Sequence, residues 1–239
     1  MGAVQRIGAT IAEYEGILAS NEQDYFAARS TLVADAVIEA SSADSLRSML
    51  IKFHKNLSVY SICRYDIFAR RGYENALILK AFEDWEEGVK FYDELYKKDS
   101  TPYTLQHAAL YLSKKNHHKE AFYYIERSKA EAGTFNWTIR NSYAIILFKA
   151  NIGGVGKASR QSLDESMNTL KECYTSDRRK GFHVIIFAEN AIQYWNKYSD
   201  DVAKDYLLQA KEWIEDVKSK EIWPRGLERV QNTINQLVR

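Results

Sequence analysis

Apolar residues recur along most of the chain at spacings of three and four, the repeat of an α-helix with one buried face. Ile7, Ile11, Tyr14 and Leu18 form such a face in a helix predicted over residues 3–18. A second helix is predicted after Asn21, a suitable N-cap, with Tyr25, Leu32 and Ala36 inward. A third helix follows residues 41–44 with Leu46, Met49, Leu50, Phe53 and Leu57, and a fourth covers residues 59–70 before Gly72.

From residue 72 onward the pattern becomes repetitive. Tetratricopeptide (TPR) units are about 34 residues long and consist of two antiparallel helices with small residues at their contacts. The segment from Pro102 to Gly133 fits this description, with a turn at residues 115–118. The expected packing residues are Leu105, Ala108, Ala109 and Leu112 in the first helix, and Ala121, Ile125 and Ser128 in the second.

Weaker copies of the unit flank this one. Upstream, the second helix has Gly88, Tyr92 and Leu95, and the first lies around Asn75, Ala76 and Leu79. Downstream, Ile139, Ser142, Tyr143 and Ile146 precede a predicted insertion at 151–161, after which Ser166, Leu170 and Cys173 resume the pattern. A fourth unit has Phe187, Asn190, Ala191 and Tyr194, then Ala203, Leu207 and Ala210, and a capping helix covers 223–238.

These patterns predict an all-α fold of TPR-like helix–turn–helix repeats stacked in a right-handed superhelix. We expect an N-terminal helical connector or cap over residues 1–71 and a repeat domain with its capping helix over residues 72–239. Tyr92, Tyr123 and Tyr194 are expected to fill the gaps between units, which would account for much of the 13% aromatic content.

Composition narrows the function. There are only two prolines, which favours helices over an all-β fold, and the net charge of +1 gives no global field for nucleic-acid binding. Cys63 and Cys173 lack a metal-binding or redox spacing and are interpreted as buried thiols. The sequence shows neither a signal peptide nor an apolar stretch long enough for a membrane span, so a cytoplasmic location is expected.

The strongest catalytic candidate is the loop Gly153-Gly154-Val155-Gly156-Lys157, which resembles a phosphate-binding loop. The motif GxxxxGK[ST] requires glycine at Asn151 and a hydroxyl at Ala158, so a flexible loop between helices is favoured. A stand-alone nucleotide-responsive regulator or enzyme that uses residues 153–157 is the alternative function. No catalytic residue, metal ligand or cofactor is otherwise predicted; His117 and His118 are interpreted as turn residues.

Stacked repeats line an extended groove with one side of each first helix. We predict that this concave surface binds a partner, because Trp and Arg are frequent anchors of interfaces. The alternative for the tryptophans is packing between helices. The candidate partner-binding residues are Tyr103, Gln106, His107, Lys114, Trp137, Arg140, Trp195 and Asn196, and Ala144 is placed on the same side.

Three stretches carry a resemblance to a known family: residues 29–38 (RSTLVADAVI), residues 99–130 with TPYTLQHAALYLSKKNHHKEAFYYIERSKA, and residues 136–151 (NWTIRNSYAIILFKAN). They resemble the C-terminal helical sensor region of bacterial STAND-type P-loop NTPases, many of which act in antiviral (antiphage) defence. The NTPase core of that family has no counterpart here, so the resemblance implies either the C-terminal piece of a longer protein or a stand-alone repeat protein.

The expected function is therefore that of a protein-binding sensor or adaptor rather than an enzyme. The resemblance implies target recognition within a larger defence NTPase, with a phage protein as the kind of target, and leaves self-association open. Neither a membrane nor a nucleic acid is expected as a partner.

Overall fold

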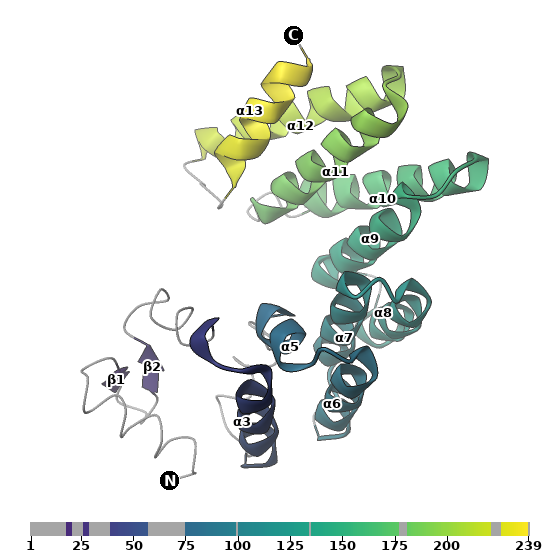
Figure 1. Ribbon diagram of the computed structural model, residues 1–239. Helices are drawn as coiled ribbons and strands as arrows, with labels where there is room; N and C mark the ends of the chain where they lie inside the picture. The colour runs from purple at the N-terminus through teal and green to yellow at the C-terminus, as the bar shows by residue number, and fades with distance from the viewer. Residues whose placement is uncertain are drawn as a thin grey trace. The chain divides into compact units, whose positions relative to one another are not determined.

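A computed structural model of the chain describes residues 18–20, 26–28, 39–56, 75–98, 100–133, 135–176, 181–220 and 226–238. The described residues are helical apart from one pair of short strands (Figure 1). The chain divides into two compact units, residues 1–111 (unit 1) and residues 112–239 (unit 2). Residues 3–17 of the helix predicted over 3–18, the helix predicted over 59–70 and the predicted boundary after residue 71 lie outside the described residues.

The first described residues of unit 1 form two antiparallel strands, β1 (Leu18–Ser20) and β2 (Phe26–Ala28), in which Ala19 pairs with Ala27. The helical prediction is wrong for Leu18, the last residue of the first predicted helix, and for residues 26–28 of the second. A strand of three residues is too short to show a period in its apolar positions, and its backbone hydrogen bonds are made with the partner strand, which local spacing does not reveal.

The described residues that follow in unit 1 form the helices α3 (Ala43–Asn56), α5 (Asn75–Ala81), α6 (Trp85–Lys98) and α7 (Pro102–Lys114), the last of which ends in unit 2. The Ser42 hydroxyl accepts a hydrogen bond from the Ser45 backbone N–H and so caps α3. Leu46 and Leu50 are buried, but Met49 is 45% exposed. Met49, which the sequence pattern grouped with Leu46 and Leu50, is therefore not part of the buried face of α3.

Helices α6 and α7 meet through a glycine. Gly88, Tyr92 and Leu95 of α6 are buried, as predicted. The Tyr111 ring of α7 lies over Gly88, where a β-carbon would be 2.2 Å from the Tyr111 hydroxyl oxygen. That hydroxyl donates to the carbonyls of Phe82 and Asp84, at 3.1 and 3.3 Å. Gly88 thus allows α7 to approach the start of α6 closely.

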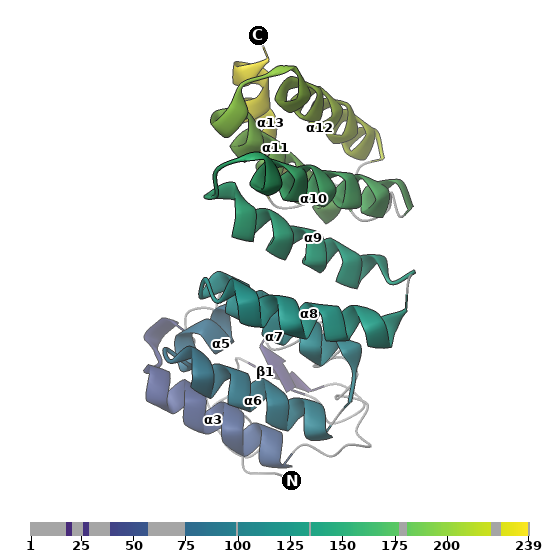
Figure 2. The same cartoon turned by 90° about the vertical axis from the view of Figure 1, so that its right-hand side faces the viewer.

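Unit 2 contains α8 (His118–Ala132), α9 (Trp137–Ile152), α10 (Lys157–Ser176), α11 (Phe182–Tyr198), α12 (Asp201–Ser219) and α13 (Leu227–Leu237). Each of the helices α8 to α12 packs against the next in sequence, and α11 also packs against α9. Figure 2 shows α9 and α10 side by side. The turn at residues 115–118 and the end of α8 at Gly133, where φ is 76°, are as predicted.

Small buried residues make these contacts close. The predicted packing positions Ala121, Ser128, Ser166, Ala191, Ala203 and Ala210 are all 0% exposed. The prediction for Tyr123 is wrong: it is 59% exposed, and its neighbour Tyr124 is buried instead. The buried stripe of α8 runs through Ala121, Tyr124 and Ile125, and Tyr123 lies about 200° around the helix from Ala121.

The predicted insertion over residues 151–161 is much shorter than expected. Helix α9 continues to Ile152 and α10 already begins at Lys157, so only residues 153–156 separate the two helices. Ser159 lies in the first turn of α10, where its hydroxyl donates to the Asn151 carbonyl at 2.7 Å. This hydrogen bond joins the end of α9 to the start of α10. The spacing of apolar residues within either helix does not reveal such a contact, so the early start of α10 was not predicted.

The core of unit 2 extends to its last helix. Leu227, Val230 and Ile234 of α13 are buried against α11 and α12, in agreement with the predicted capping helix. Within this core, the Asp164 carboxylate of α10 accepts hydrogen bonds from Tyr194 of α11 at 2.6 Å and Tyr206 of α12 at 3.3 Å. Burial and the nearby carboxylate raise the pKa of both tyrosines, so their hydroxyls remain donors.

Candidate functional site: the exposed side of α9

Trp137 and Arg140 stand together on the first turn of α9. The Asn136 side chain caps this helix by accepting a hydrogen bond from the Ile139 N–H at 3.2 Å. The Arg140 guanidinium lies 4.8 Å from the centre of the Trp137 ring, a cation–π contact. It also pairs with the Glu172 carboxylate of α10 at 2.5 Å. Both side chains are half-buried, so each presents part of its surface to solvent.

A cleft of about 550 Å³ adjoins Arg140 between α8, α9 and α10. Lys129 lies over the Tyr143 ring, 3.7 Å from its centre, and pairs with Glu126 at 3.1 Å. The Tyr143 hydroxyl donates to Glu165 at 3.1 Å. Burial, followed by the Glu165 charge, raises the pKa of Tyr143 to about 12, so the phenol is neutral at physiological pH. We call Trp137, Arg140, Tyr143, Lys129 and Glu165 the α9 patch.

The α9 patch combines aromatic surface with fixed charges of both signs. Such a surface can bury an apolar side chain against Trp137 or Tyr143 while polar groups of a partner bond to its rim. The side chains already paired with one another are held in place, which lowers the entropy lost when a partner binds.

The other predicted residues of unit 2 lie elsewhere on its surface. Trp195 packs against the hydrophobic core of unit 2, and Asn196 beside it is exposed. Lys114 is exposed at the end of α7, where partial desolvation lowers its pKa. Burial, followed by the charge of Lys114, lowers the pKa of Lys149, whose ammonium group donates to the Ser113 carbonyl at 2.7 Å.

Tyr103, Gln106 and His107 belong to α7 in unit 1. Tyr103 and His107 are half-buried, whereas Gln106 is only 5% exposed and lies in the interior. Burial lowers the pKa of His107 to about 4, so its imidazole is neutral near pH 7. Ala144, which the repeat pattern placed on the groove side, is 0% exposed; that placement is wrong.

Sequence reasoning missed three members of the α9 patch. Tyr143 was assigned to packing and is half-exposed, while Lys129 and Glu165 come from the neighbouring helices. Tyr143 follows Arg140 by three residues, so the two share a helix face, and that spacing could have identified it. The contributions of Lys129 and Glu165 depend on how α8 and α10 pack and have no local signal.

The glycine-rich loop has the surroundings of a turn between helices. A phosphate-binding loop follows a strand and directs its N–H groups at the ligand, whereas residues 153–156 follow α9. The Lys197 ammonium of α11 donates to the carbonyls of Ile152, at 2.6 Å, and Gly154. The side chain of Val155 is 93% exposed. Lys197 therefore binds the carbonyl side of this turn and secures it to α11.

Comparisons with known proteins add no relative: no family model, curated protein or solved structure matches the chain. Within the described residues, none of the helices combines the length and the apolar character needed to cross a membrane. A search of the same residues for three or more clustered His, Cys, Asp or Glu side chains that could hold a metal ion finds none. Cys173 is buried, as predicted, whereas Cys63 lies outside the described residues.

Proposed function

We propose that this chain is a protein-binding sensor or adaptor built from TPR-like repeats stacked in a right-handed superhelix, and that the α9 patch is a main contact of its partner-binding surface. The observation that carries the proposal is the contact of Arg140 with Trp137 beside a 550 Å³ cleft. Partly exposed Trp, Tyr and Arg side chains next to a cleft are the residues that most often dominate the energy of protein interfaces.

The pairing of helices in unit 2 supports the repeat interpretation. Consecutive helices pack through small buried residues, and the final helix covers the end of the core, as expected for an array in which each unit contacts its neighbours. The resemblance to the sensor region of STAND-type NTPases then suggests that the partner is a protein that triggers a larger defence NTPase. On this view the target is a phage protein and the chain works in the cytoplasm.

Site-specific photo-crosslinking tests this function. A photoreactive phenylalanine analogue replaces Tyr143 in the α9 patch or, as the control, Leu208, which is 46% exposed on α12. We expect a protein adduct of defined mass from position 143, and none from position 208, in bacterial cells challenged with phage. Equal adducts from the two positions, or no adduct at position 143 across a panel of phages, would contradict the proposal.

A charge reversal identifies the contribution of the arginine. Arg140→Glu should reduce the position-143 adduct at least tenfold, because it removes the cation–π contact and repels Glu172. Arg229→Glu is the matched control, since Arg229 is also paired with a glutamate, Glu189, but lies on α13. An equal reduction by both variants would show that the effect is not specific to the α9 patch.

The alternative, a nucleotide-responsive protein using residues 153–157, is tested by calorimetry with ATP and Mg²⁺. We expect no saturable binding, because Lys197 already binds the loop carbonyls and Ala158 supplies no hydroxyl for the metal. ATP binding that Lys157→Ala abolishes would overturn this expectation and favour the alternative.

A further inference from the structure

The cleft of the α9 patch is lined by residues of α8, α9 and α10, and Figure 2 shows α9 lying between the other two helices. Both cations in its lining are already engaged. Lys129 of α8 pairs with Glu126 at 3.1 Å, and Arg140 of α9 pairs with Glu172 of α10 at 2.5 Å. Each cation also lies over an aromatic ring. A partner that offered an anion to this cleft would have to displace one of these contacts.

Glu165 is the charged lining residue without a counter-charge among the described residues. It is exposed on α10, and its Oε1 atom accepts the hydrogen bond from the Tyr143 hydroxyl at 3.1 Å. That donor is a neutral phenol, and the ion pairs of the cleft leave Glu165 out. An ionised carboxylate has about four sites at which it can accept a hydrogen bond. Glu165 therefore has capacity for a further, charged donor.

The centre of the cleft lies in a negative potential. Two cations face three carboxylates there, namely Glu126, Glu165 and Glu172. Burial raises the pKa of Tyr143, and the charges of Glu165 and then Glu126 raise it further. The Tyr143 hydroxyl thus experiences net negative charge although two cations are near. Such a potential attracts a cation and repels an anion.

The cleft also has room for a long side chain. Its volume is about 550 Å³, and small residues line it on both sides, with Ala130 and Gly133 on α8 and Thr169 on α10. Thr169 follows Glu165 by four residues, so the two share one face of α10. Lysine and arginine carry their charge at the end of an alkyl stem that can lie along such a wall while the head reaches a polar group.

The charge of Glu165 becomes decisive when a partner covers the α9 patch. Covering the patch removes water from the carboxylate, which is costly unless another group compensates the charge. An apolar side chain of the partner supplies no compensation, and an acidic one adds repulsion. A basic side chain replaces the lost water with a charge-assisted hydrogen bond.

We propose that the protein partner inserts an arginine or lysine side chain into the cleft between α8 and α10, with its cationic head at the Glu165 carboxylate. This inference rests on the proposed function, because it specifies the chemistry that the partner presents to the α9 patch. The existing ion pairs of Lys129 and Arg140 stay in place on either side of the inserted side chain.

Photo-crosslinking beside the cleft tests the charge of Glu165. The photoreactive analogue replaces Phe135, which is 82% exposed and follows Gly133 of the lining by two residues. Glu165→Gln keeps an acceptor for the Tyr143 hydroxyl and removes only the charge, and it should reduce the adduct from phage-challenged cells at least tenfold. Glu212→Gln makes the same change at an exposed position of α12 and should not. An unchanged or increased adduct with Glu165→Gln would overturn the proposal.

The basic side chain and the protein-binding function fail in different ways. The absence of an adduct at both position 135 and position 143 would refute the function and the basic side chain together. An adduct at either position whose yield does not fall with Glu165→Gln would refute only the basic side chain. Circular dichroism confirms that each variant is folded.

A double-mutant cycle locates the cation of the partner. Mass spectrometry of the adduct identifies the partner and the segment at the cleft, which should contain an arginine or lysine. The purified partner, with that residue intact or replaced by methionine, is titrated into wild type and Glu165→Gln. Methionine should weaken binding to wild type at least tenfold and binding to Glu165→Gln much less, because the two charges interact. A segment without a basic residue, or additive effects of the two substitutions, would refute the proposal.

Discussion

His107 is a histidine whose ring is enclosed by its surroundings, and this burial changes its titration. His107 and His117 are ten positions apart, one within α7 and one in the turn before α8. The His107 Nδ1 atom is buried, and no hydrogen-bond partner for it is found within the described residues. Sequence reasoning placed His107 near the partner-binding side. A position in a helix gives the direction of a side chain, but it does not show how deeply neighbouring elements enclose that side chain.

Burial of His107 predicts a pH-dependent stability. The pKa of His107 is lowered to about 4, against about 6.5 for a histidine in the unfolded chain. Between these values the unfolded state binds a proton that the folded state does not, so the free energy of unfolding decreases as the pH falls. The loss begins near pH 6.5, is complete near pH 4 and amounts to about 3 kcal/mol.

Urea denaturation of wild type and His107→Gln from pH 7.5 to 4.5 measures this contribution. The variant should lose less stability than wild type over that range, because glutamine does not titrate. His117→Gln, which removes an imidazole from the half-buried turn position, is the control and should follow the wild-type curve. Parallel curves for wild type and His107→Gln would show that His107 does not cause the pH dependence.

At the scale of elements, sequence periodicity predicted helices better than it predicted their contacts. The helices from α5 to α13 are found near their predicted positions, because most carry an apolar face and some end at a turn signal, as α8 does at Gly133. The start of α10 was missed, since Ser159 and Arg160 are fixed by Asn151 and by Asp200 at the start of α12. Contacts between elements of this kind have no periodic signature.

The contact of α6 with α7 gives an element-scale prediction. In an open helix, Gly→Ala stabilises by about 1 kcal/mol. Here the added β-carbon of Gly88→Ala would overlap the Tyr111 hydroxyl, and Tyr111 would have to leave the Phe82 and Asp84 carbonyls. We therefore expect Gly88→Ala to destabilise the protein by about 1–3 kcal/mol, the cost of losing buried hydrogen bonds and close packing.

Thermal denaturation of Gly88→Ala, Tyr111→Phe and the double variant measures the contact. Tyr111→Phe removes the overlapping oxygen and the hydrogen bonds that hold the ring in place. Two ring carbons would still lie 2.4 and 2.6 Å from the added β-carbon, but the ring can then shift without breaking a hydrogen bond, so Gly88→Ala should cost less in the Tyr111→Phe background than in wild type. Additive effects of the two substitutions would mean that Gly88 and Tyr111 do not interact. A stabilising Gly88→Ala would show that α7 does not approach α6 as closely as the structure indicates.

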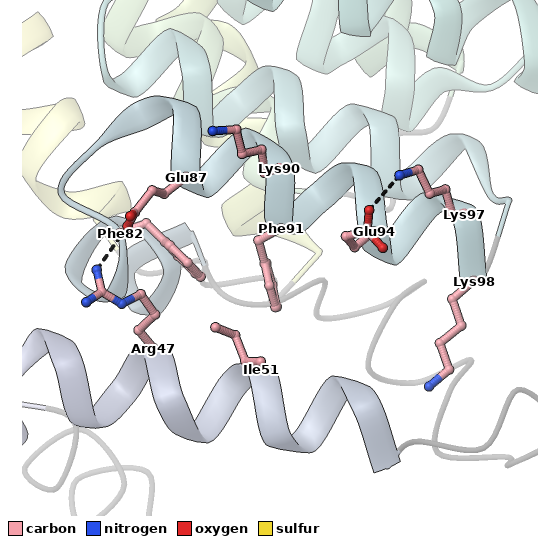
Figure 3. Close-up of a pocket in the computed structure, with 9 residues that line it drawn as sticks. All are labelled: Arg47, Ile51, Phe82, Glu87, Lys90, Phe91, Glu94, Lys97 and Lys98. Carbon is pink, nitrogen blue, oxygen red and sulfur yellow. Dashed lines mark hydrogen bonds and ion pairs between the residues drawn. The ribbon is translucent and has the colours of Figure 1, made fainter.

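At the scale of the whole molecule, the sequence predicted a helical chain with a capping helix, but it could not predict the composition of the candidate sites. Trp137 and Arg140 are neighbours on one helix and were found from their spacing. The rest of the α9 patch comes from α8 and α10, the helices before and after α9 in the chain. A cavity lined by α3 and α6 (Figure 3) joins helices that lie further apart in the sequence, and their approach includes contacts such as Arg47–Glu87. Residue spacing within one helix cannot reveal which distant helix lies opposite.

The end of the array provides the last prediction. In a stack where each helix is covered by its neighbours, the final helix must protect the core from water. Ile234 of α13 is 0% exposed and belongs to the core shared with α11 and α12, whereas Asn232 lies on the outer side of α13. Ile234→Ala should therefore lower the free energy of unfolding by about 2–5 kcal/mol, the usual cost of a large-to-small change in a core.

Urea denaturation followed by circular dichroism measures that loss, with Asn232→Ala as the matched control on the same helix. The control should change stability by less than about 0.5 kcal/mol, as is usual for surface substitutions. The core packing lost in Ile234→Ala should lower the local stability of unit 2 most. Hydrogen exchange should therefore become faster first in α11 and α12, which α13 covers. Faster exchange confined to α13, with α11 and α12 unchanged, would mean that α13 is not needed to hold the end of the array together.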